Sequence, residues 1–341
     1  MNAVLIVDKP AGLTSHDVVN RVRRILNQRS VGHLGTLDPM ATGVLPIVIG
    51  NFTRLAQFYV NSEKAYEGTV RFGFCTDTYD AEGEPTTEAR VVSLNDDELE
   101  SAVAKFRGVI EQQPPPFSAK KIKGVPAYKL ARKQKEVHLN PVQVEIKDLE
   151  VLGVDVDRMR FRARVSSGTY MRSVAHDLGK ALGCGAHLES LRRTVVAEFE
   201  IAEAQTLDEL SAAARKSGVV ERAPRPRLAK STNTDASTVL TTSLEERSPQ
   251  GSVQGGNEIL IPQPLLELFV HPRKLLPQMP SVTADELTAA RIRAGRTVNL
   301  PDLSRSRQVK VFADQRDLIA IATRVAGTLF HAKIVLASSL T

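Results

Sequence analysis

The sequence predicts an α+β protein with a largely antiparallel sheet, followed by a small β-rich module. Apolar and polar residues alternate at 66–74 and again near 142–155 and 158–165, which is typical of half-buried strands. Elsewhere apolar residues recur at helical spacing, as at Leu99 and Val103. Alternating strands with such helices set among them indicate α+β architecture.

The N-terminal elements are a buried strand and a capped helix. Residues 4–7 form a short apolar run that ends in the turn-forming sequence at 8–10. Thr14 or Ser15 can cap the next helix. Its apolar face is formed by Val18, Val22, Ile25 and Leu26.

The middle of the chain changes character after about residue 212. Residues 217–257 contain no aromatic residue, and small or polar residues dominate from 231 onward. Such a segment cannot bury enough apolar surface to offset its ordering entropy. We therefore predict one folded domain over 1–212, a flexible linker over 213–263, and a loosely coupled C-terminal module over 264–341.

The C-terminal module begins with one helix. Thr283 and Glu286 have the spacing of a capping box, and Gly295 is placed to end the helix. Apolar or alternating segments around 309–312, 318–322 and 329–336 predict strands.

The charge distribution indicates a polyanionic partner. The chain has 45 Lys and Arg against 39 Asp and Glu, a net charge of +6. Residues 271–341 hold 11 basic and 5 acidic residues, so they account for all of this excess. Residues 118–135 carry seven basic residues and no acid. Charge gathered in this way favours nucleic-acid binding over general solubility.

Several protein classes are excluded by absent patterns. Two cysteines, Cys75 and Cys184, cannot build a disulfide framework or a Cys-rich zinc site, so we expect a reducing, cytoplasmic location. The sequence has no apolar run long enough for a membrane span and no signal-peptide pattern. It also lacks phosphate-loop, dinucleotide and zinc-protease motifs. Asp77 and Asp80 resemble part of a calcium loop, but the required glycine is missing, so we interpret their spacing as chance and predict no metal.

The loop at 32–43 is the first candidate for chemistry. Its three glycines and one proline impose an unusual backbone path, and such loops often carry functional side chains. Asp38 precedes Pro39, which favours an extended backbone. The alternative is that Asp38 caps a turn and that His33 is a structural hydrogen-bonder.

The segment at 167–173 is the second candidate, at a strand-to-helix junction that Thr169 could cap. Arg172 falls in the first helical turn, where the helix dipole disfavours a cation unless a carboxylate or phosphate meets it. Tyr170 can equally be a core residue with a solvated hydroxyl.

The acid-free stretch at 118–135 is the third candidate. Its basic residues suit phosphate contacts, and the aromatic residues Phe117 and Tyr128 suit base stacking. The alternative is a solvated basic loop, although solvated surfaces usually mix signs. The proposed contacts to the RNA backbone are Lys120, Lys121, Lys123 and Arg132.

Together these blocks resemble the bacterial tRNA pseudouridine-55 synthase family, the TruB-like enzymes, over residues 2–205. The matching segments, in order, are Asp8-Lys9-Pro10-x-Gly12, GHLGTLDPMATGVLP at 32–46, Lys64-Ala65-Tyr66, the Thr76-Asp77-Thr78-x-Asp80 block, Ser118-Ala119, SGTYMRS at 167–173, and GCGAH at 183–187 followed by Leu191-Arg192-Arg193. The C-terminal module is similar to the family's small PUA-type RNA-binding module, mainly through residues 283–298.

The resemblance implies a pseudouridine synthase fold, a central mixed sheet with a cleft, and a target uridine in the T-loop of tRNA. It implies that Asp38 is the catalytic aspartate, that Arg172 pairs with it and that Tyr66 packs on the target base. By the same resemblance, the residues that meet substrate are His33, which inserts into the T-loop, the pocket residues Tyr170 and Leu191, and Lys9 near the site.

The reaction that this resemblance implies breaks the bond between C1′ and N1 of uridine and rejoins the base through C5. No redox change or net hydrolysis occurs, so no cofactor is expected. Asp38 can serve as nucleophile or as base, and the sequence leaves open whether it attacks the sugar, attacks the base or removes a sugar proton. The base must be flipped out of its loop at a cost of a few kcal/mol.

Two other functions remain open: a non-catalytic RNA-binding or RNA-folding protein on the same fold, and a pseudouridine synthase that acts on another RNA. We expect tRNA, through its T-arm, as the partner, no membrane and no obligate protein partner. The sequence departs from the family pattern at Leu34, where a small polar residue is common, and at Phe117, where tyrosine is common.

Overall fold

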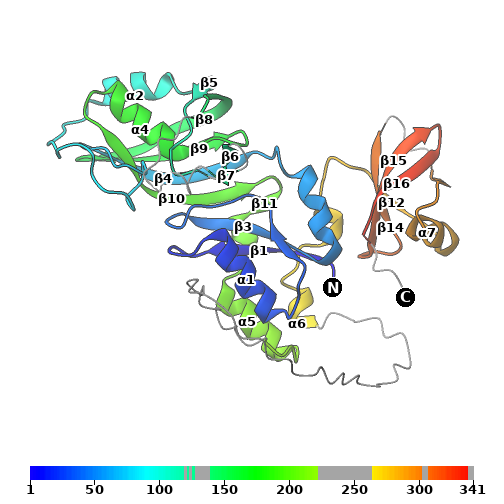
Figure 1. The fold of residues 1–341 in the computed structure, drawn as a ribbon. Helices are drawn as coiled ribbons and strands as arrows, with labels where there is room; N and C mark the ends of the chain where they lie inside the picture. The colour runs from blue at the N-terminus through cyan, green and yellow to red at the C-terminus, as the bar shows by residue number, and fades with distance from the viewer. Residues whose placement is uncertain (119–120, 123–124, 127–138, 222–262, 302–305, 337–341) are drawn as a thin grey trace, which may run out of the picture.

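The computed structural model confirms an α+β architecture, with a nine-stranded sheet, a five-stranded sheet and a two-stranded pair (Figure 1). The residues that it describes are 1–118, 121–122, 125–126, 139–221, 263–301 and 306–336.

The large sheet has nine strands, and most of them pair antiparallel, as predicted. Its main path runs β1-β3-β10-β4-β9-β8-β5, with β2 paired to β3 and β11 paired to β10. Among the described strands of this sheet, β10 and β3 form the parallel pair. The strands are β1 (Ala3–Lys9), β2 (Val31–His33), β3 (Thr42–Ile49), β4 (Lys64–Phe72), β5 (Gly108–Gln112), β8 (Val142–Asp155), β9 (Arg158–Val165), β10 (Ala186–Val196) and β11 (Phe199–Glu200).

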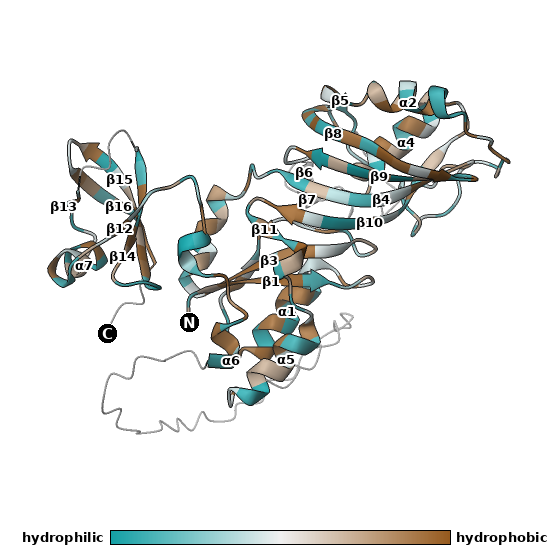
Figure 2. Cartoon of the chain, turned by 180° about the vertical axis from the view of Figure 1, so that it is seen from behind, coloured by the Kyte–Doolittle hydropathy of each residue, from teal (hydrophilic) through white to brown (hydrophobic). Residues whose placement is uncertain are grey.

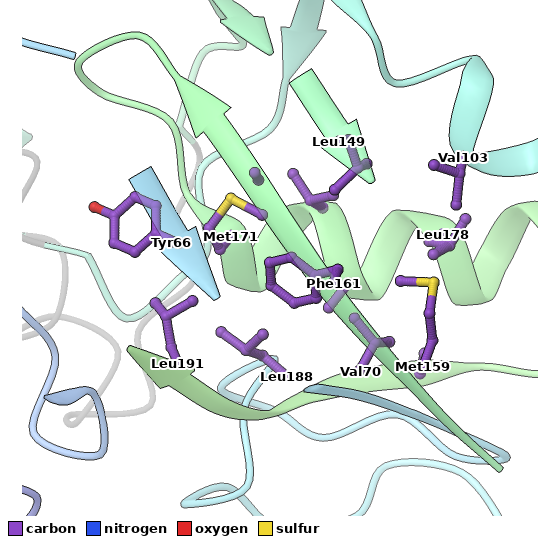
Figure 3. Packing of buried hydrophobic residues seen from close by; sticks show 14 of the residues in the cluster. Tyr66, Val70, Val103, Leu149, Met159, Phe161, Met171, Leu178, Leu188 and Leu191 are labelled. Atoms are coloured by element: carbon purple, nitrogen blue, oxygen red, sulfur yellow. The ribbon is translucent and has the colours of Figure 1, made fainter. Parts of the chain in front are cut away.

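Strand β9 shows how the sequence pattern produces the sheet. Its residues alternate between arginine and apolar side chains, and the apolar ones are buried on one face while the arginines face solvent. The buried face packs on α2 (Asp96–Ala104) and α4 (Met171–Ala181), forming the core drawn in Figure 3. This core sits directly beside the strands that carry the candidate site.

A second core lies under β1 and β3. The helices α1 (Ser15–Ile25) and α5 (Leu207–Lys216) pack there, and both carry hydrophobic and hydrophilic segments in Figure 2. Thr14 caps α1 through a full capping box with Asp17, which decides between the two predicted caps. A 3-10 helix, η1 (Gly50–Phe58), follows β3.

The C-terminal module is a five-stranded sheet in the order β12-β14-β15-β16-β13. Its predicted helix is present, but Asp285 caps it instead of Thr283, which lies at the end of a strand. Gly295 follows the helix with a φ of 70°, which confirms the predicted end. Its elements are β12 (Ser281–Thr283), α7 (Glu286–Arg293), β13 (Val298–Asn299), β14 (Gln308–Phe312), β15 (Leu318–Ala326) and β16 (Leu329–Val335).

The expectation of a loosely coupled C-terminal module is wrong. One apolar cluster, which we call the junction, contains residues from both sheets: Val4, Ile6, Leu34, Phe52, Leu55, Phe199, Leu275, Leu276, Phe312, Leu318, Ile321, Ile334 and Leu336 are among its members. Polar contacts cross it as well, including a 2.7 Å hydrogen bond from Asn2 Nδ2 to the Leu336 carbonyl oxygen. Leu276 N donates to Glu198 Oε1 at 2.8 Å.

The remaining described elements are short. They are β6 (Lys121–Ile122) and β7 (Val125–Pro126), which pair with each other, η2 (Ile201–Glu203), α6 (Gln263–Leu266) and η3 (Pro272–Lys274). No helix in the described part of the chain is both long and apolar enough to cross a bilayer.

Candidate active site

The loop between β2 and β3 presents Asp38, and its backbone is fixed from several sides. Ser15 Oγ accepts a 2.8 Å hydrogen bond from Leu37 N. Lys9 Nζ donates to the Pro39 carbonyl oxygen at 3.0 Å. The turn itself is closed by backbone atoms, since Ala41 N donates to the Asp38 carbonyl oxygen at 3.1 Å. The Asp38 carboxylate is directed instead to a guanidinium.

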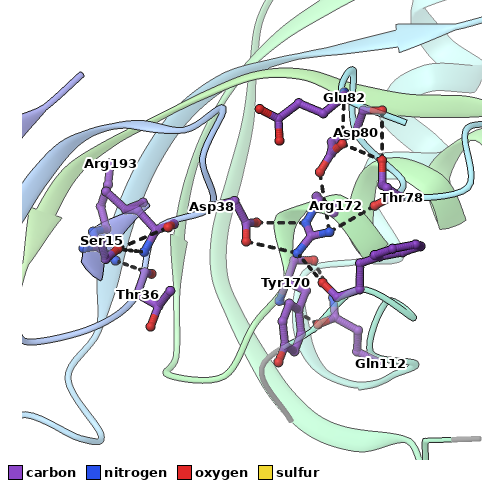
Figure 4. A network of polar contacts seen from close by, with 12 residues as sticks. Ser15, Thr36, Asp38, Thr78, Asp80, Glu82, Gln112, Tyr170, Arg172 and Arg193 are labelled. Carbon is purple, nitrogen blue, oxygen red and sulfur yellow. Dashed lines mark hydrogen bonds and ion pairs between the residues drawn. The ribbon is translucent and has the colours of Figure 1, made fainter. Parts of the chain in front are cut away.

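That guanidinium belongs to Arg172, in the first turn of α4. Its Nη2 donates to Asp38 Oδ1 at 3.1 Å, and its Nε lies 2.8 Å from Asp38 Oδ2, so the ion pair brings both carboxylate oxygens to the guanidinium (Figure 4). The Arg172 side chain is 5% exposed and that of Asp38 is 35% exposed. The sequence predicted that an anion would meet Arg172 in this first helical turn, and in the structure that anion is Asp38. The helix begins after Tyr170 and not at Thr169, whose hydroxyl donates to the Ser166 carbonyl oxygen.

Arg172 also contacts a second carboxylate, that of Asp80, which the sequence did not predict. Its Nη1 lies 3.5 Å from Asp80 Oδ2 and donates to the Thr78 carbonyl oxygen at 3.1 Å, while Nη2 donates to the Phe117 carbonyl oxygen at 3.1 Å. The Asp80 side chain is buried and accepts from Thr78 Oγ1 at 2.6 Å. The spacing of Asp77 and Asp80, which we interpreted as chance, therefore places the Asp80 carboxylate beside Arg172. The described residues contain no cluster of three or more side chains that could bind a metal ion.

The charges around Asp38 change the pKa of several neighbours. Partial burial, Asp80 and Asp38 raise the pKa of Glu82 above its usual range. Burial lowers the pKa of Lys9 to about 8, against the opposing effect of Glu82 and Asp38. Burial and the nearby Arg193 lower the pKa of Lys64 to about 8. The site therefore gathers several charged groups around Asp38, of which Lys9 and Lys64 are the more buried.

A cavity of about 280 Å³ opens in front of Asp38. Its lining includes Asp38, Arg172 and three of the predicted pocket residues: Tyr66 from β4, Tyr170 before α4 and Leu191 from β10. The volume lies near the lower end of the roughly 300–1,000 Å³ of small-molecule pockets, which suits a single flat base. Figure 3 places the Tyr66 and Leu191 side chains near each other at one end of the buried core.

Tyr170 is held by a buried glutamine. Its backbone N donates to Gln112 Oε1 at 2.8 Å, and Gln112 Nε2 returns a 3.1 Å bond to the Tyr170 carbonyl oxygen. Burial raises the pKa of the Tyr170 hydroxyl, so this group stays protonated. Gln112 was not predicted, because a lone glutamine at the end of a strand gives no sequence signal.

Two predicted substrate contacts lie outside this cavity. Lys9 is fully buried, and its three protons are donated to the carbonyl oxygens of Pro10, Leu13 and Pro39 at 2.7 to 3.0 Å. Lys9 therefore stabilises the backbone of the loop that carries Asp38. His33 ends β2 and is half-buried; burial and the charge of Arg193 lower its pKa, which keeps the ring neutral at pH 7.

The proposed RNA-backbone contacts fall largely outside the described residues. Lys120, Lys123 and Arg132 are not described, and of the region around Lys121 the structure gives the backbone pairing of β6 with β7. Leu34, a departure from the family pattern, is buried in the junction.

Comparisons with known proteins point to one family. A model of the TruB family pseudouridylate synthase N-terminal domain matches residues 23–171, and a model of the tRNA pseudouridylate synthase B C-terminal domain matches residues 172–229. The chain is 46% identical over 339 residues to tRNA pseudouridine synthase B of Solibacter usitatus, covering 98% of this chain and 100% of that protein. It is 48% identical over 211 residues to tRNA pseudouridine synthase B of Aquifex aeolicus, covering 61% of this chain and 73% of that one.

Solved structures share the fold at lower identity. An H/ACA ribonucleoprotein bound to a substrate RNA containing 2′-deoxyuridine matches with a TM-score of 0.65 at 21% identity, covering 98% of this chain and 85% of that one. A Cbf5-Nop10-Gar1 complex matches with a TM-score of 0.65 at 22% identity and the same coverage.

Proposed function

The chain belongs to the TruB family of pseudouridylate synthases, and on that premise we propose that it converts uridine 55 in the T-loop of tRNA to pseudouridine at Asp38. The observation that carries the proposal is the hydrogen-bonded ion pair between Asp38 and the buried Arg172, both of which line a base-sized cavity. The enzyme is an isomerase, as its relatives' names indicate.

Asp38 is the reacting carboxylate in this proposal. The C1′–N1 bond of the uridine breaks, the uracil ring turns, and a bond forms between C1′ and C5. C5 loses its proton and N1 gains one, so the product is an isomer of the substrate. Either use of a carboxylate, as nucleophile or as base, needs its ionised form and a fixed direction of attack. The Arg172 guanidinium pairs with that form and fixes both oxygens, and 35% exposure of the Asp38 side chain leaves the group open to the cavity.

The walls of the cavity receive the flipped base. Tyr66 offers an aromatic face, Leu191 an apolar side, and Tyr170 a protonated hydroxyl at the rim. His33 fills the stack that the base leaves, a role that suits the neutral ring implied by its lowered pKa. Flipping costs a few kcal/mol, which contacts to the rest of the RNA must supply.

The acid-free stretch at 118–135 supplies part of those contacts. Its basic residues Lys120, Lys121, Lys123 and Arg132 bind phosphates of the T-arm in this proposal. Reversing the three lysines to glutamate should weaken tRNA binding and lower the slope of log Kd against log salt by about one for each lost phosphate contact. An unchanged slope would remove this stretch from the interface.

The deciding experiment maps pseudouridine in cellular RNA. Cells that lack this protein should have uridine at tRNA position 55, and the wild-type chain should restore pseudouridine there, whereas an Asp38→Asn chain at equal abundance should not. Restoration by Asp38→Asn would favour an RNA-folding protein without catalysis. Loss of pseudouridine from ribosomal RNA, with position 55 unchanged, would identify a synthase for a different RNA.

A further inference from the structure

Arg193 is a buried cation in the same cavity whose contacts differ from those of Arg172. Its side chain is among the most buried of the chain, at 1% exposed. Its guanidinium donates from Nε to the Val44 carbonyl oxygen at 2.8 Å, from Nη1 to that of Thr36 at 3.1 Å, and from Nη2 to that of Gly35 at 3.1 Å. Figure 4 shows it beside Thr36, behind the loop that carries Asp38.

These three carbonyl groups lie on both arms of the Asp38 loop. Gly35 and Thr36 lead into Asp38, and Val44 lies on β3, where the chain returns. The planar fork of an arginine donates in fixed directions from three separate nitrogens, whereas the donors of a lysine all lie on one atom. The side chain of Arg193 therefore fixes the separation of the two arms.

The backbone of Arg193 contacts the same loop. Arg193 pairs in register with Gly43, and a Cβ atom at Gly43 would lie 2.2 Å from the Arg193 carbonyl oxygen. Gly43 also has a φ of 101°, so a side chain is disfavoured there on both grounds. The glycine allows β10 to approach the loop closely.

Arg193 also connects the loop to the opposite wall of the cavity. On its other side it pairs in register with Tyr66 on β4, so the two residues lie opposite each other in the sheet. Arg193 and Tyr66 both line the cavity with Asp38. One residue thus contacts the segment that presents the carboxylate and pairs with the residue whose ring is proposed to receive the base.

We propose that Arg193 is a positioning residue for pseudouridine formation, which sets the distance and angle between Asp38 and the base held on Tyr66. The inference rests on the proposed function. Arg193 acts through the loop backbone and Tyr66, and it requires no contact with the substrate. Its removal should therefore slow the chemical step more than it weakens tRNA binding.

The test uses Arg193→Ala in the full-length protein, with guanidinium ion as the added probe. The single-turnover rate of pseudouridine formation on tRNA should fall by about 100-fold or more, as expected for misplacement by about 1 Å. The Kd for tRNA should change by less than about threefold. Added guanidinium should restore part of the rate in a saturable way, because it can occupy the vacated site and rebind the carbonyl groups.

Two further variants keep the test decisive. Arg162→Ala removes an arginine that pairs with Glu67 on the solvent-facing side of the sheet, so it should keep the wild-type rate and show no rescue. Arg193→Lys retains the charge and is expected to fold if the alanine variant does not. It should still be slowed, because an ammonium group cannot hold the three carbonyl groups as the fork does.

Three results would contradict the role of Arg193, and a fourth would contradict the proposed function itself. A wild-type rate in either Arg193 variant, or a weakened Kd with an unchanged single-turnover rate, would overturn the positioning role. A slow alanine variant that folds normally but does not respond to guanidinium would also contradict it. A wild-type protein that forms no pseudouridine in tRNA would overturn the proposed function, and the role of Arg193 with it.

Discussion

The cavity around Asp38 and the junction with the C-terminal module both join segments that are distant in the sequence, but through different interactions. The cavity is assembled by buried cations: Arg172 binds carboxylates, and Lys9 and Arg193 bind backbone carbonyl groups. The junction is assembled mainly by apolar side chains, and hydrogen bonds from Asn2, Asn51 and Arg54 to the backbone of 335–336 also cross it. Hydrogen bonds and ion pairs fix direction, whereas apolar packing mainly adds stability. Loss of a contact should therefore impair catalysis in the first region and stability in the second.

The largest expected effect follows removal of Arg172. Arg172→Met leaves Asp80 buried without its cation and frees Asp38 to rotate. We expect unfolding free energy to fall by about 3–5 kcal/mol and turnover by about 100-fold or more. Denaturant titration and single-turnover assays measure the two losses.

Arg172→Lys is the matched variant, since it keeps the charge but loses the fork. It should recover much of the stability and little of the turnover. If Arg172→Lys had the wild-type turnover, the directed contacts of the guanidinium would not be needed for catalysis. The proposed difference between the cavity and the junction would then be wrong.

A mutation at the junction should cause a comparable loss of stability but leave catalysis intact. Leu275 is fully buried there, and Leu275→Ala should lower the unfolding free energy by about 2–5 kcal/mol. Below the unfolding temperature its single-turnover rate should match the wild type. Leu287→Ala is the control, because that leucine is 73% exposed, and its effect should stay within about 0.5 kcal/mol.

The smallest expected effect concerns His176, which lies on α4 and stacks on Tyr79 with ring centroids 3.7 Å apart. Burial lowers its pKa from 6.5 to about 4. The unfolded chain therefore takes up this proton first as the pH falls, and stability is lost between about pH 6.5 and pH 4. Relative to His176→Phe, the wild type should lose up to about 3 kcal/mol across this window and nothing at pH 7, since one pKa unit corresponds to about 1.4 kcal/mol. Equal slopes of unfolding free energy against pH in the two proteins would contradict the assignment.

The sequence predicted the pairing of Asp38 with Arg172 for a physical reason. A cation in a first helical turn is unfavourable without an anion, and the resemblance supplied the aspartate. The alternating strands and the β-rich module were predictable because burial on one face leaves a period of two in the sequence.

Other features depend on contacts that no local pattern encodes. Lys9 was predicted to contact the substrate. The sequence does not show whether a lysine donates to buried carbonyl groups, as Lys9 does, or lies in solvent. The role of Asp80 arises only when its loop reaches Arg172. The low-complexity stretch suggested loose coupling, whereas the apolar residues of the junction come from segments on either side of it.

The central claim is that the cavity performs its chemistry through the Asp38 carboxylate. The most direct measurement compares Asp38→Asn with the wild type on tRNA in a single-turnover assay, with tRNA affinity measured in parallel. Asparagine has nearly the same shape and can still hydrogen-bond, but it cannot serve as a carboxylate nucleophile or base. We expect no pseudouridine above background and a Kd within about threefold of the wild type. Pseudouridine formation by Asp38→Asn at the wild-type rate would contradict the account.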